Sequence, residues 1–386
     1  MRIVLNGWFI GQSGTGSGQY VRQLAQRLPR LAPQHAYHLV VPDRGSFTVI
    51  DLPADLQTLT ASLRPPRSNL RKALFEQSIV PRAARALRAD LLHVPYWAPP
   101  LSASMPIVAT IHDIIPIVLR EYRGDVRVRL YTALVAAAAR GATLTLTDSA
   151  ASKRDIVRRL GIPESRVRVI YLAADPKFSP RSDAVDRAAV RRKYDLRDEY
   201  VLYLSGFDPR KNVETALQVY TWAQSAIGNS HPLVIAGRLP DTTNGFFHDP
   251  RRIARQLEVE DVVRFIGEVA EEDLPALYQG ATAFLYPSRY EGFGLPALEA
   301  LACGVPVVGS NAASIPEIVG DAGSLVNPDD ARSMAGALIG VITQGDLRVT
   351  LAERAVAQAS RFSWEQTARE TIAAYESVFS PKNHRA

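Results

Sequence analysis

The chain has 386 residues, of which 47% are hydrophobic and 22% charged, the composition of an ordinary globular protein. Its length exceeds the size at which one core usually stops growing, so we expect two domains. The one cysteine, Cys303, excludes an intrachain disulfide, favours a reducing compartment and is expected to be a small buried hydrophobe. No window reaches the roughly 18 uncharged apolar residues of a spanning helix. We therefore expect a cytoplasmic protein, or one peripheral at the inner face of the plasma membrane.

The net charge of +6 conceals a difference between two parts of the sequence. Residues 1–172 hold 23 Lys and Arg against 11 Asp and Glu, a net charge of +12; residues 173–386 hold the remaining 22 against 28, a net charge of −6. A basic part beside an acidic part predicts that the basic part meets something anionic: nucleic acid, phospholipid or a phosphorylated substrate.

Short apolar segments alternate with helical patterns along the first part of the chain. Helical periodicity includes residues 18–28 and 127–141. Strands are predicted over residues 3–9, 37–41, 91–94, 107–111 and 143–147. A polar, charge-dense stretch over residues 175–200 then interrupts the alternation and indicates a connector with one helix. We place a domain boundary near Ala174.

The alternation restarts after this connector. Strands are predicted over residues 200–206, 231–237, 262–267, 282–288, 305–310 and 322–326. The fold class is therefore α/β, with two doubly wound Rossmann-like domains in tandem, residues 1–174 and 175–363. Such sheets bind ligands at the carboxyl ends of their strands, here in a cleft between the domains. The last helical pattern, about residues 364–386, is expected to cross back onto the first domain.

One stretch of the second domain combines glycines, carboxylates and a helix start. Pro296 suits a first helical position and Gly304 a C-terminal cap, which predicts a helix over about residues 296–303. The loop before it offers backbone N–H groups to a phosphate or a sugar hydroxyl. Glu291 lies in that loop and Glu299 one turn into the helix, and two acceptor-only side chains suit a ligand rich in hydroxyls. The alternative is a loop acid and a partner of the helix dipole.

The stretch PSRYEGFGLPALEALACGVPVVGSNAASIPEIVGDAG, residues 287–323, resembles the nucleotide-sugar signature of the family 4 glycosyltransferases, retaining enzymes of the GT-B fold. The resemblance implies that Glu291 contacts the donor hexose and Glu299 the ribose hydroxyls. It also implies backbone contacts from the loop to sugar and phosphate, through Gly292, Phe293, Gly294 and Leu295.

A second resemblance lies in VLYLSGFDPRKNVETAL, residues 201–217, similar to the segment in which the family's basic pair meets the diphosphate. Here the pair is Arg210 and Lys211. The chain departs from one common family form because Phe207 stands where an arginine follows the glycine, which makes Arg210 a weaker candidate than Lys211. Fixed cations stabilise a departing diphosphate without a metal; the alternative is a solvated pair in a loop.

In the first domain, TIHDIIP matches the family's histidine position, which implies that His112 points into the cleft near the donor sugar. Asp113, the next residue, either takes part in the function of the site or only fixes the loop. The stretch TDSAASKRDIV resembles the family's V-S-x-x-S-K-x-D pattern, in which Ser149 and Lys153 shape the cleft. A structural role is the alternative for each of these residues.

The glycine loop GQSGTGSGQYVRQL follows the first strand and opens a helix. Its spacing differs from the dinucleotide fingerprint, although Asp43 could imitate the ribose-binding acid of a dehydrogenase. By resemblance, the backbone N–H groups of Gly16 and Gly18 reach the donor diphosphate; the alternative is a plain loop. The sequence has no D-x-D triplet and no metal-ligand spacing of its histidines, so we expect neither a metal nor a cofactor.

These resemblances predict a retaining glycosyltransferase that moves a hexose from a nucleoside diphosphate sugar to a glycan or polyprenyl-linked acceptor. The DPRKN and HDIIP forms resemble bacterial mannosyltransferases of surface-polysaccharide assembly and favour GDP-mannose, with a UDP-hexose as second choice. A GT-B epimerase or phosphorylase, a sugar-nucleotide sensor and a nucleic-acid-binding protein are the rival classes. The sequence has no recognised nucleic-acid-binding motif, so no nucleic-acid partner is expected.

The acceptor side depends on an arginine-rich segment, residues 64–88. It suits either an anionic membrane surface or a solvated helix pair. Its basic residues are Arg64, Arg67, Arg71, Lys72, Arg82, Arg85 and Arg88, interleaved with Leu70, Leu74 and Phe75.

Overall fold

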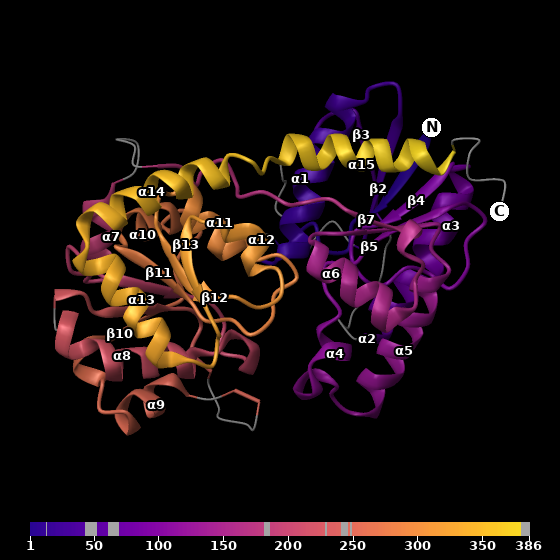
Figure 1. Ribbon diagram of the computed structural model, residues 1–386. Coiled ribbons are helices and arrows are strands. Elements are labelled where there is room, and N and C mark those ends of the chain that lie inside the picture. Colours follow the sequence, from indigo (N-terminus) through magenta and orange to yellow (C-terminus); the bar gives the residue numbers. More distant parts are fainter. Residues whose placement is uncertain are drawn as a thin grey trace. The chain divides into compact units, whose positions relative to one another are not determined.

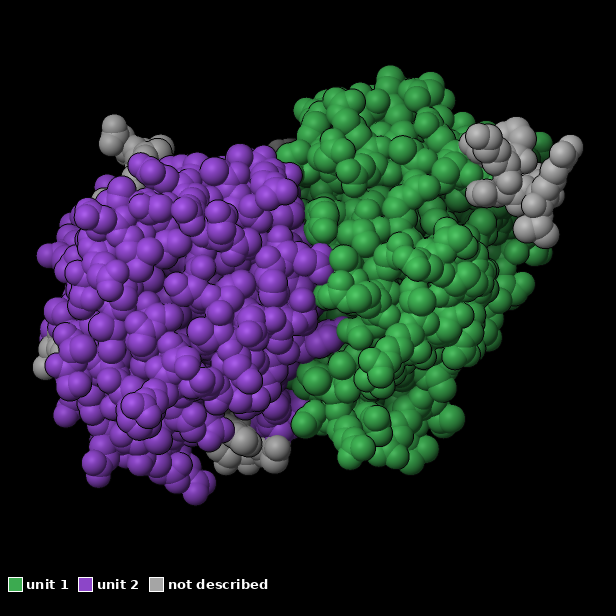
Figure 2. All heavy atoms as spheres, viewed as in Figure 1, with its two compact units in different colours: residues 1–172, 363–386 green, residues 173–362 purple. Residues whose placement is uncertain are grey.

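The computed structural model describes residues 1–12, 14–42, 52–60, 69–180, 186–227, 230–240, 246–247 and 249–379. The chain forms two compact units, coloured separately in Figure 2. Unit 1 consists of Met1–Leu172 with Ser363–Ala386, and unit 2 of Ala173–Phe362. Asp43, Arg64 and Arg67 lie outside the described residues.

Unit 1 is built on a parallel sheet of seven described strands in the order β3-β2-β1-β4-β5-β6-β7 (Figure 1). The strands are β1 Arg2–Asn6, β2 Ala36–Val41, β3 Leu56–Thr60, β4 Leu91–Val94, β5 Ile107–Thr110, β6 Leu144–Thr147 and β7 Val167–Val169. Its α-helices are α1 Gly16–Leu31, α2 Asn69–Leu74, α3 Val80–Ala86, α4 Ile115–Val118, α5 Val126–Arg140, α6 Ala150–Asp155 and α15 Trp364–Val378. The strand order reverses between β1 and β4, the switch point at which doubly wound sheets bind ligands.

Unit 2 repeats this plan with six described strands in the order β10-β9-β8-β11-β12-β13. The strands are β8 Val201–Leu204, β9 Leu233–Ala236, β10 Val263–Gly267, β11 Ala283–Tyr286, β12 Val307–Ser310 and β13 Gly323–Val326. The helices are α7 Arg187–Lys193, α8 Val213–Ile227, α9 Pro250–Gln256, α10 Leu274–Gly280, α11 Leu295–Ala302, α12 Ile315–Val319, α13 Ala331–Thr343 and α14 Gly345–Ala359. Its switch point lies between β8 and β11, so the loops that follow these two strands meet at one edge of the sheet.

The strands of unit 2 are buried on both faces, as expected where helices cover a parallel sheet on either side. Val201 and Tyr203 pack in one core with α8 and α13. Leu202, between them, packs in the opposite core with residues of α10 and α11. The period-2 alternation of a strand thus divides one short apolar run between two cores.

The helix α15 packs against α1 of unit 1, after the chain has passed through unit 2 (Figure 1). Glu365 on α15 accepts from Arg30 at 3.0 Å, and the Tyr375 hydroxyl lies 2.6 Å from His93 Nδ1. Unit 1 therefore needs the last helix of the chain to complete its core.

The α/β fold class predicted from the sequence is confirmed, and each predicted strand corresponds to a strand of the structure. The strands β3 and β7 were not predicted, because LQTLT is half polar and VRV has only three residues. None of the helices in the described part of the chain is long and apolar enough to cross a membrane.

Candidate active site

The loop after β11 is fixed by a serine from the next strand connection. Ser314 donates to the backbone oxygens of Glu291 at 2.9 Å and of Phe293 at 2.6 Å. Gly294, the residue before α11, has a φ of 112°, which glycine adopts without strain. The helix runs over Leu295–Ala302, one residue earlier at each end than predicted, and its free N–H groups begin at the end of this loop.

Glu291 lies at the centre of a charge cluster across the switch point of unit 2. Its Oε1 accepts from Lys211 Nζ at 2.7 Å and from the Tyr286 hydroxyl at 2.8 Å, and its Oε2 accepts from Arg210 at 2.7 Å. Lys211 and Glu291 are 9% and 7% exposed. The sequence predicted separate contacts, with the cations on a diphosphate and Glu291 on a hexose; the structure brings all three side chains together.

Burial alone would raise the pKa of Glu291, but the charges of Lys211 and Arg210, with hydrogen bonds from Lys211 and Tyr286, outweigh it and lower the pKa to about 2. Glu291 is therefore ionised at neutral pH. Arg210 also pairs with Asp208, at 3.3 Å, and donates to the Tyr290 carbonyl at 3.3 Å. Arg210 is thus bound by two carboxylates and Lys211 by one, and the contact of either cation with a diphosphate stays a prediction.

Lys211 is positioned by the residue that follows it. A single 3₁₀ turn over Pro209–Lys211 ends at Asn212, which has a φ of 57°. Asn212 Nδ2 donates to the carbonyls of Pro287 at 3.1 Å and Pro328 at 2.7 Å, which ties the loop after β8 to two neighbouring loops. Sequence reasoning missed this role, although an asparagine directly after a predicted ligand is a signal for a left-handed turn.

Phe207, which stands in place of the family's arginine, is a core residue. It is 4% exposed and stacks on Tyr203 with ring centroids 6.4 Å apart. A side chain at Gly237 would approach the Phe207 ring to 3.3 Å. The position therefore supports the loop by packing rather than by charge.

Glu299 lies on α11 in an environment opposite to that of Glu291. It is 7% exposed and accepts from the Tyr278 hydroxyl at 3.0 Å. Burial raises the pKa of Glu299 to about 7, although the Tyr278 hydrogen bond and the charge of Lys177 act in the other direction. Burial and the charge of Glu299 also raise the pKa of the buried Cys303 thiol to about 12. Cys303 is therefore an unreactive thiol at neutral pH.

The histidine predicted in unit 1 has a partner that the sequence reading passed over. His112 Nδ1 lies 2.6 Å from Oδ2 of Asp148, the residue directly after β6. Asp113 Oδ1 accepts from the Ile115 amide at 3.1 Å, so it fixes the loop. Asp148 lies in the TDSAASKRD stretch at the position where the family pattern has a valine. An aspartate in place of that valine was the signal in the sequence that could have identified the partner of His112.

The other residues of this stretch have structural partners. Ser149 caps α6 by accepting from the Ser152 amide at 3.0 Å. Lys153 pairs with Glu164 at 3.2 Å. The expectation that Ser149 and Lys153 shape the cleft stays a prediction.

The glycine loop enters α1 through a capped turn. Thr15 Oγ1 accepts from the Gly18 amide at 3.1 Å, so this N–H group already has a protein partner. A side chain at Gly18 would come within 2.0 Å of the Gln12 carbonyl, so Gly18 is required for close packing. Gly16 is exposed at the first position of α1. The predicted donor contacts of Gly16 and Gly18 stay predictions.

The arginine-rich segment forms α2, a π-helical turn over Phe75–Ile79, and α3. Two of its residues point inward, which corrects their assignment to a membrane-facing surface. Phe75 is fully buried in the core of unit 1. Lys72 Nζ lies 3.7 Å from the buried Glu76 and within 5.7 Å of the ring centroids of three aromatic residues, Phe9, Tyr96 and Tyr131.

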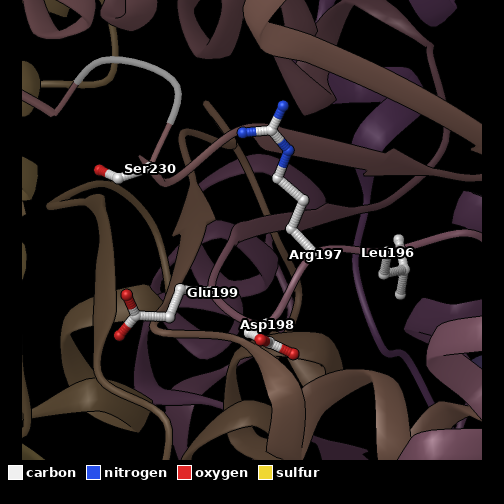
Figure 3. A pocket seen from close by; sticks show the side chains of 5 residues that line it. All are labelled: Leu196, Arg197, Asp198, Glu199 and Ser230. Atoms are coloured by element: carbon white, nitrogen blue, oxygen red, sulfur yellow. The ribbon is translucent and has the colours of Figure 1, made fainter.

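Unit 2 also has a hollow of about 440 Å³. Figure 3 shows the five residues that line it. Leu196, Arg197, Asp198 and Glu199 precede β8, and Ser230 precedes β9. The hollow therefore lies at the amino edge of the sheet, opposite the edge that carries Lys211 and Glu291. It is separate from the predicted donor site.

Comparisons with known proteins agree with this architecture. Residues 186–358 match the family described as Glycosyl transferases group 1, and residues 14–178 match Glycosyltransferase Family 4. The chain is 37% identical over 270 residues to the O-antigen chain mannosyltransferase B of Escherichia coli, which covers 70% of each protein. It is 31% identical over 271 residues to the serotype-specific mannosyltransferase WbdA of Escherichia coli, which covers 69% of this chain but 32% of that protein.

Among solved structures, Anabaena HepE in complex with UDP-glucose is similar with a TM-score of 0.74 and 19% identity. The match covers 98% of this chain and 100% of that one, and shows a shared fold. With two switch-point sheets and both family matches, the chain belongs to the family 4 glycosyltransferases and has the GT-B fold.

Proposed function

We propose that the protein transfers mannose from GDP-mannose to a hydroxyl of a glycan or lipid-linked acceptor, with retention at the anomeric carbon and without a metal. The observation that carries the proposal is the cluster of Lys211, Arg210 and Glu291 at the switch point of unit 2. The sugar assignment rests on the 37% identity to an O-antigen chain mannosyltransferase.

In this proposal unit 2 binds the donor. Lys211, assisted by Arg210, stabilises the negative charge that develops on the departing diphosphate, and the N–H groups at the start of α11 face its oxygens. Glu291 orients the hexose and Glu299 accepts from the ribose hydroxyls. The two carboxylates differ in pKa, about 2 against about 7, so only Glu291 is fully ionised over the whole neutral range.

The transfer step breaks the bond from the anomeric carbon to the diphosphate oxygen and forms a bond to the acceptor oxygen on the same face. The acceptor proton passes to the departing diphosphate. We assign no carboxylate nucleophile, since orientation by His112 and Glu291 and charge stabilisation by Lys211 account for the protein's part.

The first experiment is a thermal-shift screen against GDP, UDP and ADP, because a ligand at 100 times its Kd stabilises the fold by about 2.7 kcal/mol. GDP is expected to give the largest shift. The second is acceptor-dependent release of nucleoside diphosphate from GDP-mannose, in the presence and absence of EDTA. Loss of release in EDTA would contradict the metal-free proposal.

A UDP-hexose donor is the second candidate, because a protein of the same fold is known in complex with UDP-glucose. A larger thermal shift with UDP than with GDP would select it. Conversion of the sugar nucleotide to its epimer without net release of nucleoside diphosphate would favour an epimerase, phosphate-dependent turnover a phosphorylase, and binding without turnover a sensor.

We also propose that unit 1 rests on an anionic membrane through the outer side of α2 and α3. Leu70 and Leu74 are 79% and 48% exposed, and Arg82, Arg85 and Arg88 are exposed as well. Exposed leucines and arginines in one short segment suit an interface with anionic lipid.

A further inference from the structure

A hydrogen-bonded pair, the half-buried His112 and the buried Asp148, lies at the carboxyl edge of the sheet in unit 1. The strands β5 and β6 pair in parallel with Thr110 opposite Leu146. His112 follows β5 by two residues and Asp148 follows β6 directly. The register of two adjacent strands therefore sets the distance between the two side chains.

The pair leaves Nε2 as the ring nitrogen without a hydrogen-bond partner of good geometry in the described residues, and this atom is buried. The side chains of His112 and Asp148 are 17% and 3% exposed, and Nδ1 lies 2.6 Å from the carboxylate Oδ2. An ionised carboxylate only accepts, so the proton is on Nδ1. Nε2 makes no hydrogen bond of good geometry within the described residues, although the Pro95 carbonyl lies nearby.

The rest of His112 is held at two further points. The ring of Tyr20 meets the imidazole edge to face, with centroids 5.1 Å apart and an interplanar angle of 89°. The Tyr20 hydroxyl is itself 3.1 Å from Thr110 Oγ1. Ser152 Oγ donates to the backbone oxygen of His112 at 3.0 Å. Backbone, ring face and Nδ1 are thus all occupied by protein groups.

We propose that Asp148 is a positioning residue for the transfer reaction: by accepting the Nδ1 proton it fixes the His112 ring, so that Nε2–H donates to an oxygen of the nucleoside diphosphate sugar. The inference rests on the proposed function. It assigns to Asp148 a role that acts only through His112, and it makes the protonated imidazole the active form.

The charges around His112 favour that form. Burial would lower the pKa of His112, but the charge and hydrogen bond of Asp148, then the charge of Asp113 and the Pro95 carbonyl, outweigh it and raise the pKa above its ordinary value. The other titratable groups that face the ring stay neutral. Burial raises the pKa of Tyr20, and burial together with the His112 charge lowers the pKa of His93 to about 3.

The raised pKa of His112 sets how activity depends on pH. A histidine pKa raised by folding means that the imidazolium persists to higher pH in the folded protein and is lost as the pH rises through the folded pKa. Activity that needs the imidazolium therefore falls on the alkaline side. Asp148→Asn removes the carboxylate charge, so the alkaline limb moves to lower pH.

The test compares wild type, Asp148→Asn, His112→Gln and the double variant, with Glu376→Gln as matched control. Glu376 is the partner of another histidine in unit 1, His35, at 3.2 Å. The first readout is a ¹⁵N imidazole NMR titration, which needs no turnover. We expect Nδ1 of wild-type His112 to stay protonated, a pKa lowered by Asp148→Asn and no change in Glu376→Gln. Wild-type His112 titrating at or below about 6.5 would overturn the proposal even if Asp148→Asn fails to fold.

The second readout is kcat/KM against pH with the donor selected by the thermal-shift screen. We expect Asp148→Asn to lower kcat/KM about 100-fold, the low end of what one preorganised hydrogen-bond donor contributes. In the His112→Gln background, Asp148→Asn should cost nothing further. Additive losses, or an unmoved alkaline limb, would refute the assignment. If the NMR result holds but no sugar nucleotide is turned over, the proposed function fails and the placement of His112 by Asp148 stands.

Discussion

At the scale of single residues, Glu291 and Glu299 show how one sequence motif can hold two different carboxylates. Both were predicted as acceptors for hydroxyl groups. The structure surrounds Glu291 with Lys211 and Arg210 but gives Glu299 one hydroxyl, that of Tyr278. Environments that push two pKa values apart are typical of sites with divided roles.

Glu299→Gln tests the raised pKa of this buried carboxyl group. The folded pKa of Glu299, about 7, is raised from its ordinary value, so this residue's contribution to stability is lost as the pH rises from about 4.5 to 7. We expect the variant to be more stable than wild type at pH 8, by at most about 3 kcal/mol, with little difference at pH 4.5. Thermal unfolding across this range measures it, with the exposed Glu353→Gln as control.

The same variant should bind the donor more weakly. Wild-type affinity for the nucleotide is expected to increase as Glu299 ionises near pH 7, and Glu299→Gln should lack that increase because its amide carries no charge. Calorimetric titration between pH 5.5 and 8.5 measures both effects. Unchanged donor affinity in the variant would rule out the ribose contact.

At the scale of elements, the glycine loop before α1 has a packing requirement that its spacing did not reveal. Gly18 lies against the loop that precedes it, with the carbonyls of Gln12 and Phe9 within 3 Å of where a side chain would begin. Gly14, four residues earlier, has nothing within 4 Å. The backbone around Gly18 therefore leaves no room for a side chain, whereas the space around Gly14 is open.

Gly18→Ala is expected to destabilise unit 1 by about 1–3 kcal/mol, the usual cost of overpacking, because backbone must move. Gly14→Ala is the matched control and should leave stability within about 0.5 kcal/mol. Denaturant unfolding measures both. Equal stability of the two variants would show that the entrance to α1 adapts at no cost.

At the scale of the whole molecule, the basic residues of the arginine-rich segment differ in how far they are exposed. Lys72 is half-buried, paired with Glu76 and close to three aromatic rings, whereas Arg82, Arg85 and Arg88 are exposed. A count of basic residues therefore overstates the charge that a membrane meets.

Liposome co-sedimentation tests whether the exposed arginines bind an anionic membrane. The full chain should bind vesicles that contain anionic lipid, with affinity that falls as salt is added, and should not bind neutral vesicles. Replacing Arg82, Arg85 and Arg88 by Gln should abolish binding. The same change at three exposed arginines elsewhere in unit 1, Arg123, Arg127 and Arg129, should not. Equal loss in both variants would reduce the proposal to non-specific charge.

The sequence by itself determined the tandem α/β architecture, because apolar periodicity depends on local burial and survives in the order of residues. It also determined the family, through the spacing of Glu291 and Glu299 around a glycine turn. The strands β3 and β7 were not predicted, because a short or half-polar edge strand carries little periodic signal.

Only the tertiary structure decided which side chains meet. Lys211 and Glu291 are separated by 80 positions, and His112 and Asp148 by 36, yet each pair shares a hydrogen bond of 2.7 Å or less. Those contacts follow from strand order and register, which bring the ends of sequence-distant strands to one edge. Because a pKa depends on the charges and burial that such neighbours provide, the electrostatics of the site could not be read from local sequence.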